Sequence, residues 1–271
     1  MSERIAFIGG GNMAQAIIGG LIQQGVSPQN IDVVEPSADT RDQLLKSFDV
    51  TAQAQASDAL TAAGLVVWAV KPQTFKDAAL ATAPFTAHAL HLSVAAGIRT
   101  DSMAAWLGSD RIVRAMPNTP ALVGQGISGL FARAGASAAD RARVEQVMAT
   151  TGEFLWMDAE DQLDVVTALS GSGPAYVFYF MEAMTMAGTE MGLSREQAHQ
   201  LAVATFAGAS GLAKTSAESP QVLRQRVTSK GGTTAAAIAS MEDNDVRALF
   251  IDAMYAARER AKKLGNEFGA A

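Results

Sequence analysis

Residues 5–14 read Ile-Ala-Phe-Ile-Gly-Gly-Gly-Asn-Met-Ala, and this stretch decides the fold of the first half of the chain. Ile5 to Ile8 is a continuous apolar run, which is typical of a strand buried on both faces of a parallel sheet. Glycines follow at once, and a helical pattern then runs from Asn12 to about Gln24. Strand, glycine-rich turn and helix in this order predict a dinucleotide site, with the pyrophosphate on the helix N-terminus.

Each position of the turn has a predicted task. Gly9 permits the tight bend, Gly11 lets the backbone approach the pyrophosphate, and Ala14 allows close packing of helix on strand. Glycine clusters also occur in ordinary turns, but the strand before this one and the helix after it favour a nucleotide. The predicted cofactor-binding residues here are Ile8, Gly9, Gly10, Gly11, Asn12, Met13 and Ala14.

The adenosine end of the cofactor is predicted at the end of the next strand, Ile31–Val34. Glu35 follows that strand, close to the offset of an acid that binds the adenosine ribose. Its charge would repel a 2′-phosphate and so favours NADH. Ser37 and Arg41, just beyond it, could instead hold that phosphate. The sequence therefore predicts NADPH or NADH as cofactor and leaves the choice open.

Further strand-like runs at Leu65–Val70, Leu90–Ala95 and Arg111–Met116 alternate with helical segments. This alternation predicts an α/β Rossmann domain with a doubly wound parallel sheet. Ligands of such sheets lie beyond the carboxyl ends of the strands, so two strand ends should border the nicotinamide half of the cofactor. The residues predicted there are Ala69, Val70, Lys71, Pro72, Ala95, Ala96 and Gly97.

The character of the chain changes near residue 158, after which helical patterns dominate. We predict a dinucleotide-binding Rossmann domain over residues 1–157 and an all-helical domain for substrate binding and dimerisation over 158–271. Residues 175–191 are apolar on nearly every face, which predicts a helix buried on all sides. A helical domain this apolar favours a homodimer with a hydrophobic, intertwined interface.

Composition excludes several classes of function. The 271 residues are 49% hydrophobic, and the net charge of −6 gives no footprint for nucleic acid or an anionic membrane. No apolar stretch is long enough to span a bilayer and no targeting signal is evident, so we expect a cytoplasmic protein. Cysteine is absent and the three histidines are scattered, so no metal site is expected. His88 and His91 are predicted to lie at an edge or on the surface, and His199 on a helix.

Two glycine-rich segments in the second half, Leu169–Ala175 and Val227–Thr234, each lead into a helical pattern. Backbone N–H groups and hydroxyls at a helix start make a receptor for a carboxylate. Capping and close helix packing would explain either segment alone. Two of them behind a dinucleotide domain favour a functional role.

The whole set of motifs resembles the pyrroline-5-carboxylate reductase family, and the resemblance runs the full length of the chain. A C-terminal signature, from Pro220 through Val227 and Thr234 to Glu242, is the most diagnostic part. The other matching stretches are Gly9–Ala14, Ala69–Pro72, Arg114–Pro120 and Ser170–Tyr176.

This resemblance implies a Rossmann domain followed by an all-helical dimerisation domain, with dimers that often assemble into decamers. It also implies reduction of the cyclic imine 1-pyrroline-5-carboxylate to L-proline by NADPH or NADH, the last step of proline biosynthesis. Thr234 is placed near the ring nitrogen, and Glu160 and Thr167 line the same pocket; these three are the candidate catalytic residues. The pocket takes residues from both subunits. The substrate carboxylate is assigned to Ser229, Gly231, Gly232, Thr233 and Thr234.

Two other functions were weighed against this one. A β-hydroxyacid dehydrogenase also joins a Rossmann domain to a helical one, but alcohol oxidation needs a base, which that family provides as a lysine soon after a similar glycine-rich segment. The comparable position here is Val177, and no lysine occurs between Lys76 and Lys214. A sensor that binds the cofactor without catalysis has no need of the carboxylate receptor at residues 229–234.

Overall fold

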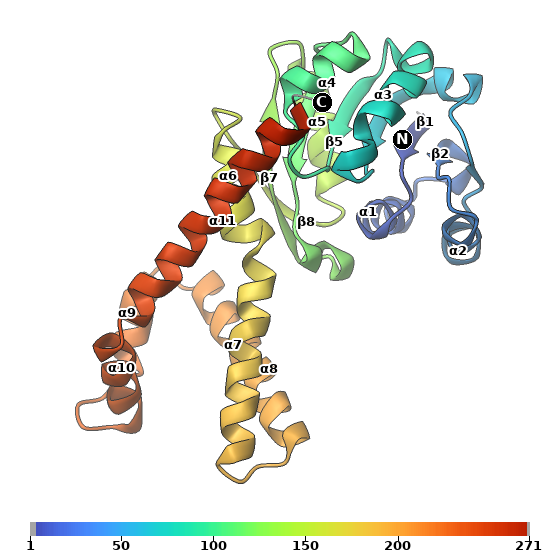
Figure 1. Ribbon diagram of the computed structural model, residues 1–271. Helices are drawn as coiled ribbons and strands as arrows, with labels where there is room; N and C mark the ends of the chain where they lie inside the picture. The colour runs from blue at the N-terminus through green and yellow to red at the C-terminus, as the bar shows by residue number, and fades with distance from the viewer. Residues whose placement is uncertain (1–3, 270–271) are drawn as a thin grey trace. The chain divides into compact units, whose positions relative to one another are not determined.

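The structure is a computed structural model that describes residues 4–269 and forms two compact units (Figure 1). The sheet unit contains the residues up to Ser172 together with those from Ala257 onward. The helical unit contains Gly173–Ala256. The last strand ends at Trp156, next to the domain boundary predicted at residue 158, but the short helices up to Ser172 and the end of the last helix pack with the sheet unit. The two-domain division at 157 and 158 therefore stays a prediction.

One eight-stranded sheet, in the order β3-β2-β1-β4-β5-β6-β7-β8, forms the first unit. From β3 to β6 the strands are parallel, and the order reverses at β1, which pairs with both β2 and β4. This confirms the doubly wound fold and places the switch point of the sheet at β1. The strands are β1 Arg4–Ile8, β2 Ile31–Val34, β3 Ala52–Gln53, β4 Ala63–Trp68, β5 Leu90–Ser93, β6 Ile112–Met116, β7 Gly126–Ala132 and β8 Gly152–Trp156.

The last two strands depart from the predicted parallel arrangement. β7 runs antiparallel to β6, and β8 is parallel to β7. The connection from β6 to β7 is a short 3₁₀ turn, Thr119–Val123, where a parallel pair would need a crossover of a dozen residues or more. Neither strand was predicted, and their direction follows from that short connection.

Helices cover both faces of the sheet, and α1 shows why they form where they do. Its buried residues Ala14, Ile17, Ile18 and Leu21 recur at helical spacing and make one apolar face. Each of these helices of the sheet unit follows a turn that ends in a polar residue or glycine, and in α3 a proline occupies the first turn. They are α1 Asn12–Gln23, α2 Ala38–Phe48, α3 Pro72–Thr86, α4 Thr100–Leu107, α5 Ala138–Met148 and α6 Gln162–Val166, followed by a π-helical turn, Thr167–Gly171.

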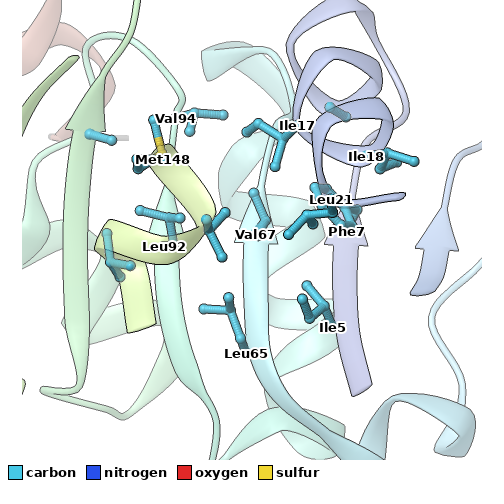
Figure 2. Close-up of a cluster of buried hydrophobic side chains, with 14 of the residues drawn as sticks. Ile5, Phe7, Ile17, Ile18, Leu21, Leu65, Val67, Leu92, Val94 and Met148 are labelled. Atoms are coloured by element: carbon cyan, nitrogen blue, oxygen red, sulfur yellow. The ribbon is translucent and has the colours of Figure 1, made fainter. Parts of the chain in front are cut away.

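Alternate residues of the central strands feed two separate cores. Ile5 and Phe7 of β1 point to the side of α1 and α5, where they meet Leu65 and Val67 of β4 (Figure 2). The residues between them point to the opposite side, where Trp68 packs among the residues of α3 and α4. Burying each large apolar side chain contributes about 1.5–3 kcal/mol, so this two-sided burial fixes the register of the strands.

The surface position predicted for His91 is wrong. His91 lies in β5 with its side chain 0% exposed, and its Nδ1 accepts a hydrogen bond of 3.2 Å from the indole nitrogen of Trp68. Desolvation on burial lowers the pKa of His91 to about 4, so the imidazole is neutral at physiological pH. His88, just before the strand, is exposed as predicted. β5 lies inside the sheet, between β4 and β6, and all four of its residues are buried, so neither face of this strand offers a surface position.

The helical unit begins with two long antiparallel helices, α7 and α8 (Figure 1). They approach closely where Gly188 lies against Ala198, since a Cβ on Gly188 would come 2.9 Å from that alanine's Cβ. Along residues 4–269, no helix is both long and apolar enough to cross a membrane. The remaining helices complete the all-helical second half, whose members are α7 Gly173–Glu190, α8 Arg195–Thr215, α9 Pro220–Arg226, α10 Thr233–Asp243 and α11 Val246–Gly269.

The helix predicted over residues 175–191 is present, but a single chain does not bury it. Phe178 and Tyr179 are 62% and 69% exposed, and Met186 is 58% exposed. The groove between α7 and α8 has a volume of about 690 Å³ and an apolar lining that includes Phe178 and Met181. One copy of the chain therefore leaves the most apolar helix largely uncovered.

Candidate functional site

The turn after β1 lies where the sheet order reverses, and only glycine fits its first position. Gly9 has a φ of +95°, and a Cβ there would lie 2.7 Å from the carbonyl oxygen of Ala69 at the end of β4. Its N–H donates to the carbonyl of Val34 at the end of β2. Gly9 thus joins three neighbouring strand ends, as the tight-turn assignment requires.

Gly10 is buried, but the next two positions, Gly11 and Asn12, are open toward solvent and suited to an anion. Gly11 is exposed, and a Cβ built on it meets nothing within 4 Å. It is the N-cap of α1 and supplies no side-chain cap, which leaves the first-turn N–H groups of the helix available. Gln15 donates 2.9 Å to the carbonyl of Gly10 and steadies the turn from behind. The residues present therefore fit a dinucleotide pyrophosphate on this helix N-terminus.

The carboxylate of Glu35 is fixed at the edge of the same turn. One of its oxygens accepts the N–H of Gly10 at 2.8 Å, and the other accepts the N–H of Ser37 at 2.8 Å. Arg41 donates through one guanidinium nitrogen to the carbonyls of Glu35 and Pro36 at 2.9 and 2.7 Å. The acid that favours NADH therefore lies next to the hydroxyl and the guanidinium that could hold the 2′-phosphate of NADPH. The choice between the two cofactors stays open.

The other two predicted strand ends lie at the same edge of the sheet. The N–H of Ala69 bonds to the carbonyl of Ile8, and the N–H of Val94 bonds to that of Trp68. Lys71 is exposed at the start of α3, and Ala96 is exposed between β5 and α4. The structure therefore brings the predicted cofactor residues of four strands together, and their binding of a cofactor stays a prediction.

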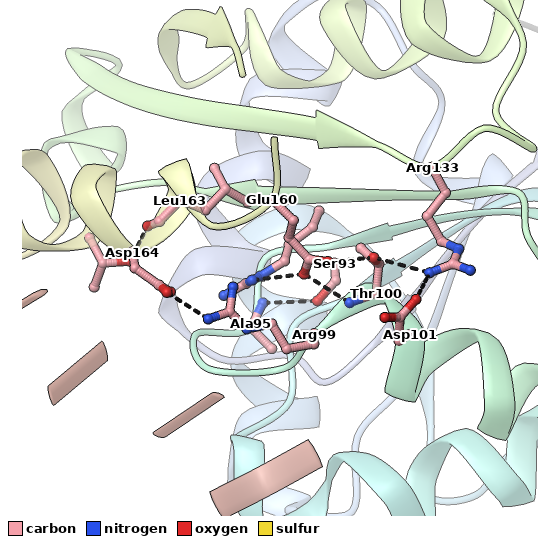
Figure 3. A network of polar contacts seen from close by, with 11 residues as sticks. Ser93, Ala95, Arg99, Thr100, Asp101, Arg133, Glu160, Leu163 and Asp164 are labelled. Atoms are coloured by element: carbon pink, nitrogen blue, oxygen red, sulfur yellow. Dashed lines mark hydrogen bonds and ion pairs between the residues drawn. The ribbon is translucent and has the colours of Figure 1, made fainter. Parts of the chain in front are cut away.

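Glu160 and Thr167 both lie in the sheet unit, and both have hydrogen-bond partners. Glu160 accepts the N–H and the hydroxyl of Thr100, at 2.9 and 2.6 Å, and a guanidinium N–H of Arg114 at 2.9 Å (Figure 3). Thr167 donates to the carbonyl of Leu163 at 2.7 Å within its own helix. The hydroxyl proton of Thr167 and both carboxylate oxygens of Glu160 thus take part in hydrogen bonds within the sheet unit. The catalytic assignment of the two residues stays a prediction.

Asn118 is a site-forming residue that the sequence reasoning quoted only as part of a motif. Its side-chain N–H donates 3.2 Å to the carbonyl of Ser170 in the π-helical turn, and its oxygen accepts the N–H of Ile127 in β7 at 3.0 Å. The amide thus holds the glycine-rich segment that starts at Ser170. A polar residue two positions after the end of a buried strand was the available signal for this role.

The predicted substrate segment connects α9 to α10 in the helical unit. Gly231 has a φ of +76°, and the N–H of Gly232 bonds to the carbonyl of Ser229 at 3.0 Å. Gly232 is the N-cap of α10 without a side-chain cap, so the N–H groups around Thr233 and Thr234 are available to an anion. Thr234 is half-buried, while Ser229 and Thr233 are exposed.

Ion pairs hold the helices on either side of this segment. Glu242 of α10 accepts from Arg224 of α9 at 3.2 Å and from Arg247 of α11 at 2.7 Å. All three side chains are at least a third exposed, so each pair contributes little stability by itself. The arrangement nevertheless ties three helices around the glycine-rich turn.

Comparison with known proteins gives the family of the chain. Residues 4–97 match a family model described as NADP oxidoreductase coenzyme F420-dependent, and residues 160–264 match one described as pyrroline-5-carboxylate reductase dimerisation. The pyrroline-5-carboxylate reductase of Pseudomonas aeruginosa is 47% identical over 270 residues, which covers 99% of each chain. The chain belongs to the pyrroline-5-carboxylate reductase family.

Solved structures of the same family are also similar. The pyrroline-5-carboxylate reductase of Coxiella burnetii is 40% identical, with a TM-score of 0.90 over 97% of this chain and 99% of the other. The Plasmodium falciparum pyrroline carboxylate reductase, solved with NADP bound, is 29% identical, with a TM-score of 0.87 over 97% and 98% of the two chains. The predicted family and fold class are thereby confirmed.

Proposed function

We propose that this chain is a pyrroline-5-carboxylate reductase, which reduces 1-pyrroline-5-carboxylate to L-proline in the last step of proline biosynthesis. The observation that carries the proposal is the 47% identity to a pyrroline-5-carboxylate reductase along 99% of both chains. The open helix N-terminus at Gly11 and the fixed acid at Glu35 provide the cofactor half of such an enzyme. The cytoplasmic location expected from the sequence stays a prediction.

Reduction of this imine requires the protein to position the substrate more than to supply an acid. A cyclic imine is basic enough to be protonated near neutral pH, so the hydride acceptor is already a cation. A bound NADPH or NADH supplies the hydride. The chain has to fix the substrate carboxylate, orient the ring and exclude water, and such positioning can contribute roughly 7–11 kcal/mol. Few acid–base groups and many N–H donors suit this task.

We assign the substrate carboxylate to the segment Ser229–Thr234. Support comes from the uncapped N-terminus of α10 and from the left-handed turn at Gly231, which together present N–H groups at one end of a helix. Thr234 is the candidate to hold the ring nitrogen and to pass a proton to it after reduction, directly or through a water. Glu160 and Thr167 complete the set of candidate pocket residues implied by the family.

The proposal is tested by the loss of NADH or NADPH absorbance when 1-pyrroline-5-carboxylate is added. The matched pair of variants is Thr234→Ala and Thr215→Ala, since the hydroxyl of Thr215 bonds only to carbonyls of its own helix. Loss of a hydrogen bond to a charged group predicts a roughly tenfold to hundredfold fall in kcat/KM for the imine in Thr234→Ala alone, with cofactor binding unchanged. Absence of turnover with either cofactor would refute the function, and equal kinetics of both variants would refute the assignment of Thr234.

We further infer that the chain forms a homodimer through α7 and α8, on which larger assemblies such as a decamer can be built. The exposed apolar side chains of α7 support this, as does the match of residues 160–264 to a dimerisation model. Sedimentation of Phe178→Asp beside the wild-type chain tests it. We expect a dimer or larger species for the wild type and a shift toward monomer for the variant; a monomeric wild type would contradict the inference.

A further inference from the structure

A group of polar side chains surrounds the first residue of α4, Thr100, in the sheet unit (Figure 3). Glu160 accepts both hydrogen-bond donors of Thr100, its backbone N–H at 2.9 Å and its hydroxyl at 2.6 Å. The same carboxylate accepts a guanidinium N–H of Arg114 at 2.9 Å. Both partners are far from Glu160 in the sequence: Thr100 is 60 positions away and Arg114 is 46 positions away.

The contact with Arg114 gives Glu160 a fixed orientation. The Arg114 side chain is 2% exposed, and desolvation lowers its pKa while the charge and hydrogen bond of Glu160 raise it. A buried guanidinium requires an opposite charge, and removal of that charge is strongly destabilising. The Glu160 side chain is itself 16% exposed, so it has little freedom to leave this position. Its carboxylate also caps the N-terminus of α4, where the helix favours a negative charge.

Thr100 is the point at which the loop after β5 ends. At the start of this loop the hydroxyl of Ser93 accepts the N–H of Ala95 at 3.3 Å, and near its end Arg99 forms an ion pair with Asp164 at 2.5 Å. Residues 94–99 are therefore held at both ends, with Ala96 exposed between them. This is the loop predicted to lie beside the nicotinamide half of the cofactor.

The end of α11, which belongs to the sheet unit, supports the loop from behind. A Cβ on Gly97 would lie 3.1 Å from the ring of Phe268, and a Cβ on Gly265 would lie 2.8 Å from the guanidinium of Arg99. The loop therefore has no room to retreat on that side. Its remaining freedom is set by the bonds at its two ends, the buried one between Ala95 and Ser93 and the two that Thr100 donates to Glu160.

We propose that Glu160 is a positioning residue, which acts through Thr100 to hold the loop 94–99 against the nicotinamide half of the cofactor, rather than a residue that contacts the substrate. The inference rests on the proposed function in one respect, the binding of a nicotinamide cofactor at the strand ends. It replaces the pocket role that the family resemblance implied for Glu160. Both oxygens of its carboxylate accept from Thr100, the residue at which the loop ends.

Thr100→Val provides the test, because it deletes the hydroxyl's bond to Glu160, and with it a longer one of 3.4 Å that the hydroxyl accepts from Arg133, while it keeps the ion pair of Glu160 with Arg114 and the side-chain shape. The matched control is Thr86→Val, since Thr86 is also buried and its hydroxyl donates to a carbonyl of its own helix, away from the loop. Two dissociation constants are measured for each protein by titration calorimetry. One is for the reduced cofactor, NADH or NADPH, that the wild type binds more tightly, and the other is for its adenosine half alone, ADP-ribose or 2′-phospho-ADP-ribose.

We expect Thr100→Val to raise the ratio of these constants, whole cofactor over adenosine half, by about threefold to tenfold. The KM for the imine should stay unchanged, Thr100→Ser should restore the ratio, and Thr86→Val should keep it. The proposal would be overturned if Thr100→Val lowered the melting temperature as much as Thr86→Val does and left the ratio of the two constants unchanged. The contact would then be structural only. A raised KM for the imine with an unchanged ratio would also overturn it and return Glu160 to the substrate pocket. Turnover by the wild type tests the proposed function separately, since the binding ratio can be read without any turnover.

Discussion

Acid should destabilise the sheet unit through the single imidazole of His91. Its side chain is fully buried in β5, Nδ1 accepts a hydrogen bond from Trp68, and Nε2 has no hydrogen-bond partner among residues 4–269. Desolvation, helped by the positive charges of Arg111 and His88, lowers its pKa from 6.5 to about 4. The folded chain therefore keeps this imidazole neutral in a range of pH where the unfolded chain protonates it.

The size of the effect follows from linkage between protonation and folding. Because the folded-state pKa is the lower one, the unfolded chain binds the proton first as the pH falls, and stability falls with it. The contribution is complete above pH 6.5 and is lost between pH 6.5 and about 4. The difference of about 2.5 pKa units corresponds to about 3 kcal/mol in full, of which about 2 kcal/mol is lost at pH 5.

The measurement is urea unfolding of the wild type and His91→Gln at pH 8, 6.5 and 5, at one protein concentration because association adds its own stability. Glutamine can still accept from Trp68 but does not titrate. Carboxylates affect both proteins alike, so the difference between the two free energies of unfolding isolates His91. We expect that difference to shift by about 2 kcal/mol between pH 8 and 5. His88→Gln keeps the imidazole of His91 and removes only the smallest cause of its pKa shift, so its pH dependence should stay close to that of the wild type. A difference that stays constant over this range would refute the reasoning.

Three further variants probe the cofactor turn and its support. Glu35→Gln should raise the ratio of kcat/KM for NADPH to that for NADH by about fivefold, because the amide can still accept a backbone N–H without repelling a 2′-phosphate; an unchanged ratio in steady-state assays would contradict this. Gly9→Ala should cost more than about 2 kcal/mol of unfolding free energy, since its Cβ would lie 2.7 Å from the carbonyl oxygen of Ala69 at a φ of +95°; a wild-type urea midpoint would show that the turn can shift. Asn118→Asp should lower the unfolding free energy by about 1–3 kcal/mol, because it replaces the donor to the carbonyl of Ser170 with a carboxylate oxygen; thermal unfolding that matches the wild type would exclude that bond as a support.

The parts of the fold that the sequence predicted are those with local causes. The apolar run of β1, the glycines after it and the spacing of Ile17 and Leu21 act within a few residues, so they can be recognised one segment at a time. β7 and β8 have weaker local signals. Two glycines interrupt β7, and β8 at the edge of the sheet leaves Leu155 59% exposed. The direction of β7 depends on the short connection before it, which no periodicity reveals.

The candidate site likewise contains residues that could be predicted from local sequence and contacts that could not. The strand-end residues could be predicted because a parallel sheet brings the carboxyl ends of its strands to one edge, whatever the loops contain. The bonds of Glu160 to Thr100 and Arg114 could not, because they join positions 60 and 46 residues away. Burial of His91 depends on the helices that cover the face of β5 opposite Leu90 and Leu92, and its indole partner lies on another strand. Such partnerships depend on the register of neighbouring strands.

The exposed face of α7 has a thermodynamic consequence for the proposed dimer. Within the helical unit only Ala198 and Ala202 are fully buried apolar side chains, while Phe178 and Tyr179 of α7 are more than half exposed. Covering each large apolar side chain is worth about 1.5–3 kcal/mol, and ordering each residue of the backbone costs about 1–2 kcal/mol. Two buried alanines cannot offset that cost, so the proposed dimer would stabilise the helical unit by covering this apolar surface. Stability and association are then linked, and the melting temperature of the wild-type chain should rise with protein concentration, whereas that of Phe178→Asp should be lower and depend on concentration less.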